Sequence, residues 1–130
     1  DFGTATTFDV VDHDGAYIGG VIAPGVNLSL QALHQMAAAL PHVDIAKPKQ
    51  VIGKNTVSCM QSGVFWGYIG LVKEICRKIK EEKKEIMKVV ATGGLAPLLQ
   101  STEALFENVD ENLTMQGLRL IFDYNKSIES

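Results

Sequence analysis

The hydrophobic and polar positions divide the chain into β-rich stretches near its N-terminus and helical stretches further on. Residues 4–11 are rich in Thr, Val and Phe, and residues 17–23 form a second apolar run that contains Gly19 and Gly20. Asp14-Gly15 lies between the two runs, where such a pair is a strong hairpin signal. The first 23 residues therefore predict two strands joined as a β-hairpin.

Apolar residues at three- and four-residue steps predict two helices in the middle of the chain. The first has Asn27 or Ser29 as its cap and closes at Pro41. The second begins near Asn55-Thr56 and carries one apolar stripe. We expect the charged run of residues 73–88 to continue this second helix into solvent. Glutamates alternate with its lysines, which favours a solvated face with i,i+4 ion pairs over a nucleic-acid-binding segment.

The remaining elements are shorter. Residues 43–46 and 87–91 predict two further strands, and residues 95–105 and 113–124 predict two further helices. A β-hairpin followed by alternating helices and strands is typical of an α/β fold with a mixed sheet covered by helices. We find no internal repeat and no low-complexity segment.

Composition narrows the possible classes of protein. The chain has 130 residues, 46% of them hydrophobic, which is enough for one compact core. Its formal charge of −3 argues against a nucleic-acid partner, which would favour a basic patch. No apolar run approaches the roughly 18 residues that a membrane span needs. The chain opens at Asp1, without methionine and inside what looks like a structured motif, so we expect a fragment of a longer protein.

Cysteine and histidine indicate no metal or nucleophile site. Cys59 and Cys76 lie too far apart on one predicted helix to bond to each other, and neither belongs to a C-x-x-C pair. We expect two reduced cysteines, as in a cytosolic protein. The three histidines, His13, His34 and His42, are scattered and match neither a metal cluster nor a nucleophile–base pair.

Glycine- and threonine-marked turns carry the candidate chemistry, and the first of them spans residues 1–7. Gly3 lets the backbone approach a ligand, and Thr4, Thr6 and Thr7 add hydroxyl donors. Free N–H groups in such a turn suit phosphate oxygens, and Asp1 could hold a cation beside them. From spacing alone, an ordinary glycine turn leading into a threonine-rich strand is the favoured alternative. The other marked turns are residues 19–20, 23–25 and 92–94.

A second polar cluster, residues 53–56 and 60–63, lies at the start of the long helix. A helix N-terminus carries positive potential and free N–H groups, so it can receive an anion or a polar substrate. The alternative is that Asn55 or Thr56 is simply the N-cap. Gly63 and Gly67 lie one turn apart, a spacing typical of close packing, with a partner subunit as one candidate.

Six motifs in register resemble type III pantothenate kinase over nearly the whole chain. They are Asp-Phe-Gly-Thr-Ala-Thr-Thr (1–7), Gly-Gly-Val-Ile-Ala-Pro-Gly (19–25), Gly-Lys-Asn-Thr (53–56), Met-Gln-Ser-Gly (60–63), Ala-Thr-Gly-Gly-Leu-Ala (91–96) and Leu-Thr-Met-Gln-Gly-Leu (113–118). That family belongs to the superfamily of acetate kinase, sugar kinases, heat-shock ATPases and actin, built from two ribonuclease-H-like lobes. The resemblance implies that residues 1–130 form the C-terminal ribonuclease-H-like lobe of a two-lobe kinase whose N-terminal lobe is absent here.

The resemblance also implies an activity. The family phosphorylates pantothenate with ATP to 4'-phosphopantothenate, the first step of coenzyme A biosynthesis. It uses Mg²⁺ and a monovalent cation, K⁺ or NH₄⁺, and works as a cytoplasmic homodimer with no nucleic-acid or membrane partner. The phosphate loop and catalytic base of the missing lobe lie outside this chain, so we expect the fragment alone to be inactive. The implied roles are the monovalent cation for Asp1, ATP for Gly3, Thr4, Thr92, Gly93 and Gly94, and pantothenate for Thr56.

Two alternatives stay open. One is another kinase of the same superfamily, such as a sugar-kinase-like enzyme, and the other is a non-catalytic regulatory or interaction protein. The absence of a basic patch argues against direct DNA contact in the second case. An intact phosphate loop and base in the upstream coding sequence would favour a kinase, and their loss would favour the interaction protein.

Overall fold

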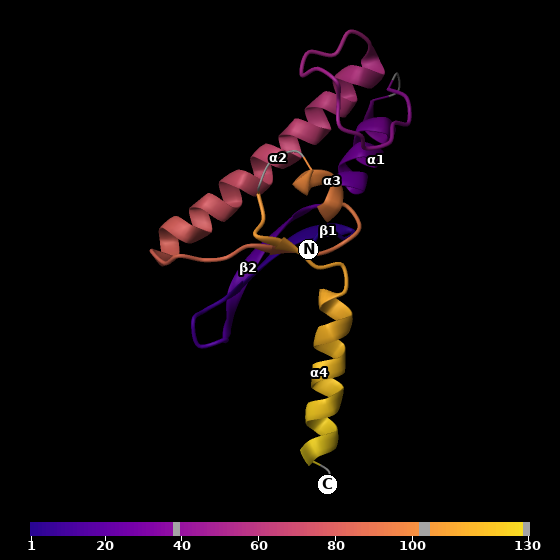
Figure 1. Ribbon diagram of the computed structural model, residues 1–130. Helices are drawn as coiled ribbons and strands as arrows, with labels where there is room; N and C mark the ends of the chain where they lie inside the picture. Colours follow the sequence, from indigo (N-terminus) through magenta and orange to yellow (C-terminus); the bar gives the residue numbers. More distant parts are fainter. Residues whose placement is uncertain (38–39, 102–104, 129–130) are drawn as a thin grey trace.

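The computed structural model describes residues 1–37, 40–101 and 105–128 of the chain (Figure 1). An N-terminal hairpin is followed by two helices and then by short strands that alternate with helices, which agrees with an α/β fold. The elements are β1 (Ala5–Val11), β2 (Tyr17–Pro24), α1 (Val26–Met36), α2 (Thr56–Lys83), β3 (Val90–Ala91), α3 (Ala96–Gln100), β4 (Asn108–Val109) and α4 (Leu113–Ile128).

The predicted hairpin is confirmed. β1 and β2 pair antiparallel over their full lengths, with an irregularity between Val10 and Val11. Asp12 organises the turn, because its carboxylate accepts hydrogen bonds from the backbone N–H groups of Ala16 (2.8 Å) and Asp14 (3.0 Å). The bond from Ala16 is the main reason why the pKa of Asp12 lies below its ordinary value.

The expected single mixed sheet is divided in two. β3 and β4 form a separate parallel pair, so the described strands make two two-stranded sheets with the order β1-β2 and β3-β4. Sequence analysis missed β4, which is only two residues long and begins with Asn108, a residue type depleted in strands. Glu107 secures this pair, since its carboxylate accepts the N–H of Val89 at 2.5 Å and its own N–H donates to the Val89 carbonyl at 2.9 Å.

The strand predicted at residues 43–46 is wrong. This segment is irregular in the structure and belongs to neither sheet. Its apolar residues serve packing instead: Val43 is buried, and Ile45 contacts both hydrophobic clusters of the core. The prediction failed because residue types that favour strands are also used for burial, and here no neighbouring strand pairs with the segment.

Helix α2 is the central support of the core. Phe65, Ile69 and Val72 pack in the larger hydrophobic cluster, together with Phe2 and Phe106, whose rings lie 5.8 Å apart. A smaller cluster joins α2 to α1 through Val26, Leu30, Val64 and Tyr68. Residues from the N-terminal loop, β3 and α3 therefore pack against α2. The apolar stripe predicted the buried Val64 and Tyr68, but it did not include Phe65, Ile69 and Val72.

The ends of α2 have clear local causes. Asn55 is the N-cap in a capping box with Ser58, and the helix ends at Lys83 because Lys84 adopts a left-handed backbone with φ of 55°. The predicted continuation to residue 88 was therefore too long. The predicted ion pairs are present in its last turns, where Arg77 contacts both Glu74 and Glu81. Those contacts raise the pKa of Arg77, with the Glu74 bond as the largest cause.

Helix α4 extends away from the rest of the molecule (Figure 1). It has no buried residue, although its sequence is amphipathic. The predicted helix over residues 95–105 is shorter in the structure, as α3, and part of that prediction lies outside the described residues. Within the described ranges, no helix is both long and apolar enough to cross a membrane. The exposed apolar side chains of α4 are Leu113, Met115, Leu118, Leu120, Ile121, Phe122, Tyr124 and Ile128.

Candidate functional site

The N-terminal loop lies against the glycine loop that follows β3. The backbone N–H of Phe2 donates to the carbonyl of Thr92 at 2.8 Å. A Cβ atom on Gly93 would lie 2.6 Å from the Phe2 carbonyl oxygen and 2.7 Å from a carboxylate oxygen of Asp1, and Gly93 has a φ of +94°. Only glycine accommodates both this backbone conformation and this approach. The two loops, far apart in sequence, are therefore held in direct contact.

The turn before α1 contacts the N-terminal loop on its other side. A Cβ atom on Gly25 would collide with the Thr4 carbonyl oxygen, so this turn also needs glycine for close approach. Tyr68 of α2 holds the turn in place, because its hydroxyl donates to the Pro24 carbonyl and lies 3.0 Å from the Ser29 hydroxyl. Three of the four marked turns thus converge around Gly3 and Thr4.

An open cavity of about 470 Å³ lies between the N-terminal loop, the loop after β3 and the first turns of α1. Gly3, Thr4 and Gly94, all predicted as site residues, contribute to its wall. Thr4 is exposed, so its hydroxyl is accessible to a ligand. The full set of lining residues is Phe2, Gly3, Thr4, Asn27, Leu28, Gln31, Gly94 and Leu95.

Helix α1 contributes residues to the cavity that sequence analysis missed. Asn27 was interpreted as a possible cap, but the N-cap is Gly25, which makes no side-chain capping bond. Asn27, Leu28 and Gln31 instead line the cavity from the first turns of the helix. The first turn holds no acidic residue, so the positive end of the helix is not offset there. The signal that pointed here was a Pro-Gly pair placed directly between a strand and a helix.

Such an arrangement suits a phosphate group. Backbone N–H groups at a helix N-terminus attract anions, and the Thr4 hydroxyl offers a further donor. Glycines at positions 3 and 94 leave the backbone open to close approach. The cavity therefore has the donors and the space that an anionic ligand requires.

Asp1 supplies a carboxylate at the edge of these loops, beside Gly93. Among the described residues, no group of three or more His, Cys, Asp or Glu side chains is arranged to hold a metal ion. A carboxylate oxygen of Asp1 and the carbonyl oxygen of Phe2 both lie close to Gly93, and oxygen atoms are the usual ligands of hard cations.

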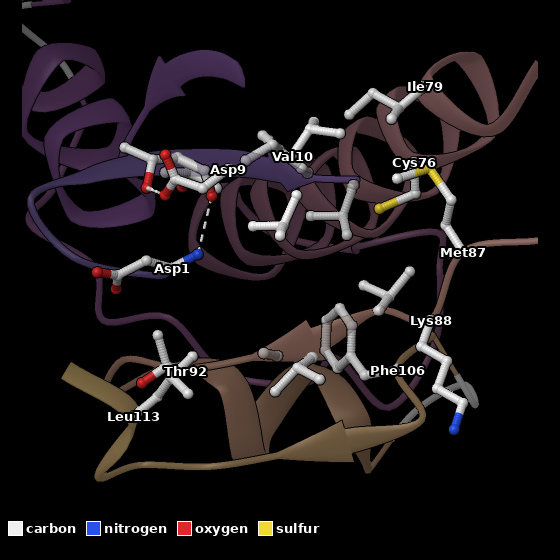
Figure 2. Close-up of a pocket in the computed structure, with 18 of the residues that line it drawn as sticks. Asp1, Asp9, Val10, Cys76, Ile79, Met87, Lys88, Thr92, Phe106 and Leu113 are labelled. Carbon is white, nitrogen blue, oxygen red and sulfur yellow. Dashed lines mark hydrogen bonds between the residues drawn. The ribbon is translucent and has the colours of Figure 1, made fainter. Parts of the chain in front are cut away.

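Four predicted residues do not line this cavity: Asp1, Thr56, Thr92 and Gly93. Asp1 and Thr92 line a different, larger cleft (Figure 2), and the carbonyl of the buried Thr92 holds the N-terminal loop. Gly93 lines neither cavity and serves the contact between the two loops. Thr56 is exposed at the start of α2 and lines neither cavity. It is also not the cap, since Asn55 accepts the Ser58 N–H at 2.9 Å, so the Thr56 hydroxyl has no capping role.

Fold and loops together define a mixed α/β domain with an anion-suited cavity beside a helix N-terminus. The sequence model of one family, type III pantothenate kinase, matches residues 1–78, which is more than half of the chain. The chain therefore belongs to the type III pantothenate kinase family, as the six motifs indicated.

Relatives support this membership and show that the chain is short. It is 72% identical over 129 residues to a type III pantothenate kinase of Roseobacter denitrificans, covering 99% of this chain and 50% of the relative. It is 71% identical over 128 residues to the enzyme of the same name from Ruegeria sp. strain TM1040, covering 98% and 49%. The chain thus spans about half the length of the curated relatives it matches.

A solved structure shares the fold. A Campylobacter jejuni protein, provisionally named a Baf family transcriptional activator, aligns with a TM-score of 0.66 and 21% sequence identity. The alignment covers 95% of this chain and 55% of that one. At this identity the likeness concerns the fold alone.

Proposed function

We propose that the full-length protein phosphorylates pantothenate with ATP to 4'-phosphopantothenate, the first step of coenzyme A synthesis. The observation that carries this proposal is about 70% identity, across nearly the whole chain, to proteins named type III pantothenate kinase. Because those relatives are twice as long, this chain would supply the C-terminal lobe, and one half of the nucleotide cleft. The catalytic base would come from the other lobe.

The cavity beside α1 is the proposed phosphate end of the ATP site. The Thr4 hydroxyl would bind phosphate oxygens, and Gly3, Gly93 and Gly94 would let the backbone approach the nucleotide. The convergence of these loops around one cavity supports the assignment. Thr92 would act indirectly: its carbonyl accepts the Phe2 N–H and so holds the N-terminal loop, without touching the nucleotide.

Cations would complete the site. The Asp1 carboxylate would hold K⁺ or NH₄⁺ at the edge of the phosphate loop, and the Phe2 carbonyl oxygen, which also lies close to Gly93, supports this role. Mg²⁺ would arrive with ATP and, together with the monovalent ion, offset negative charge on the transferred phosphoryl group. What the residues of this chain contribute is position: they fix the phosphates against the helix terminus.

Thr56 is the proposed pantothenate contact. Its exposure and its freedom from capping support a ligand-binding role. Because Thr56 does not line the ATP cavity, pantothenate would reach the phosphates from another direction. The exposed α2 positions Gly63 and Gly67, where an added Cβ meets nothing within 4 Å, are consistent with the expected homodimer.

Two substitutions in the full-length enzyme test these roles. Removing one donor to transferring charge costs on the order of 100-fold in kcat, so Thr4→Ala should lower kcat and raise KM for ATP. Thr56→Ala should raise KM for pantothenate and leave KM for ATP unchanged. Ser127→Ala, on the exposed face of α4, is the matched control. Unchanged ATP kinetics in Thr4→Ala would contradict the assignment.

A further inference from the structure

Tyr68 of α2 connects the hydrophobic core to the turn between β2 and α1. Its ring belongs to the smaller hydrophobic cluster, and only 6% of the residue is exposed. Its hydroxyl donates to the Pro24 carbonyl and lies 3.0 Å from the Ser29 hydroxyl. Because hydrogen bonds are directional and the ring is held by packing, these contacts define where the turn lies relative to α2.

The turn is held at two consecutive carbonyls, those of Pro24 and Gly25. The Gly25 carbonyl accepts the backbone N–H of Ser29 at 3.0 Å, and the Ser29 hydroxyl donates to the same oxygen at 3.1 Å. Since Ser29 also contacts Tyr68, one polar group from α2 reaches both the last residue of β2 and the first turn of α1.

The same turn lies directly against the N-terminal loop. A Cβ atom on Gly25 would lie 2.0 Å from the Thr4 carbonyl oxygen and 3.0 Å from that of Gly3. Backbones packed this closely cannot move independently. The first turn of α1 supplies Asn27 and Leu28 to the wall of the cavity that Thr4 also lines. A displaced turn would therefore change the position of α1 relative to Thr4.

We propose that Tyr68 is a positioning residue for the phosphate end of the ATP site, because its hydroxyl fixes the first turn of α1 relative to Thr4. The inference rests on the proposed function, since it concerns the same cavity. Tyr68 does not line that cavity, so its effect on a nucleotide passes through Pro24 and Ser29. A small displacement of groups that hold a ligand weakens binding even when every contact group is still present.

The proposed pantothenate contact provides an internal comparison. Thr56 and Tyr68 lie on the same helix, separated by about 18 Å along its axis at 1.5 Å a residue. Loss of the Tyr68 hydroxyl should therefore affect the two substrates differently. A purely structural role would lower the amount of active enzyme, and so the apparent kcat, without changing KM for either substrate.

Steady-state kinetics of the full-length Tyr68→Phe variant test the proposal. KM for ATP should rise at least about threefold, within the range that one hydrogen bond supports, while KM for pantothenate stays within about 1.5-fold. Ile69→Val is the matched control. Ile69 is the next residue of the same helix, is buried in the larger cluster, and its truncation costs about as much stability as one hydrogen bond. This control should leave KM for ATP unchanged.

A second variant tests whether the effect passes through the turn. Ser29→Ala removes the other hydroxyl of the contact and should also raise KM for ATP. The Ser29→Ala/Tyr68→Phe double variant should raise it no more than about twofold beyond Tyr68→Phe alone, because residues that act through one contact are not additive.

Several outcomes would overturn the inference. They are a smaller rise in KM for ATP in Tyr68→Phe, an equal rise in Ile69→Val, or effects of Ser29→Ala and Tyr68→Phe that simply multiply. Calorimetric titration with Mg·ATP separates the inference from the proposed activity. Weaker ATP binding by Tyr68→Phe, in a protein without pantothenate-dependent turnover, would support the positioning role and contradict the kinase activity. A wild-type protein that binds no ATP would contradict both.

Discussion

At the residue scale, the candidate site depends on glycines that allow three loops to touch. Gly93 combines a positive φ with contacts to Asp1 and Phe2, while its neighbour Gly94 has open space where a Cβ would go. Only the first of these adjacent glycines is therefore required by the backbone. Substituting each glycine in turn therefore separates the structural requirement at Gly93 from the proposed nucleotide contact at Gly94.

Gly93→Ala should destabilise the protein, and Gly94→Ala should not. Forcing alanine into the conformation of Gly93 costs about 1–3 kcal/mol in the free energy of unfolding, with steric overlap in addition. Gly94→Ala should stay within about 0.5 kcal/mol, as surface substitutions usually do. Urea unfolding of both variants checks this. Equal stability of the two would mean that the loops are not held together as described.

At the element scale, α2 links the sheets, α1 and the loops around the cavity. Tyr68 is the polar part of this link, since its buried hydroxyl contacts both Pro24 at the end of β2 and Ser29 in α1. Removing that hydroxyl takes a hydrogen-bond partner from both the Pro24 carbonyl and the Ser29 hydroxyl. The orientation of α1, and so of the cavity wall, depends on this contact.

Tyr68→Phe should lower the free energy of unfolding by about 0.5–1.5 kcal/mol, the usual worth of an intramolecular hydrogen bond. Tyr124→Phe is the control, because Tyr124 is 68% exposed on α4. Thermal unfolding of both variants measures the difference. Should the two variants melt together, the contact between α2 and the turn before α1 would be irrelevant to stability.

Long periodic elements were predictable from sequence and short ones were not. The hairpin and α2 follow from local signals, Asp14-Gly15 and an uninterrupted apolar stripe. Whether a short segment becomes a strand depends on whether another strand lies beside it. β4 has such a neighbour in β3 and residues 43–46 have none, and no local sequence pattern contains that information. The same holds for the site: glycine turns predicted Gly3 and Gly94, but only the tertiary fold brings Asn27 and Gln31 of α1 to the same cavity.

At the scale of the whole molecule, α4 stands out because none of its residues is buried against the rest of the protein. Its apolar side chains are exposed, with Leu120 at 70% and Phe122 at 66%. Contiguous apolar surface of this kind marks an interaction site in a soluble domain.

The 130-residue chain should therefore self-associate through α4. Leu120→Ser combined with Phe122→Ser should shift sedimentation toward monomer without changing the core, because neither side chain is buried. Ile86→Ser, at an exposed position outside α4, is the control and should leave association unchanged. A wild-type chain that sediments as a monomer would contradict this expectation.

The proposal to test first is that the full-length protein phosphorylates pantothenate. ADP release from ATP by the full-length protein, with and without pantothenate and K⁺, tests it most directly. We expect turnover that requires both, and none from the 130-residue chain alone, since phosphoryl transfer needs groups on both sides of the phosphates. Steady turnover by the isolated chain, or turnover by the full-length protein that is indifferent to pantothenate, would contradict the claim.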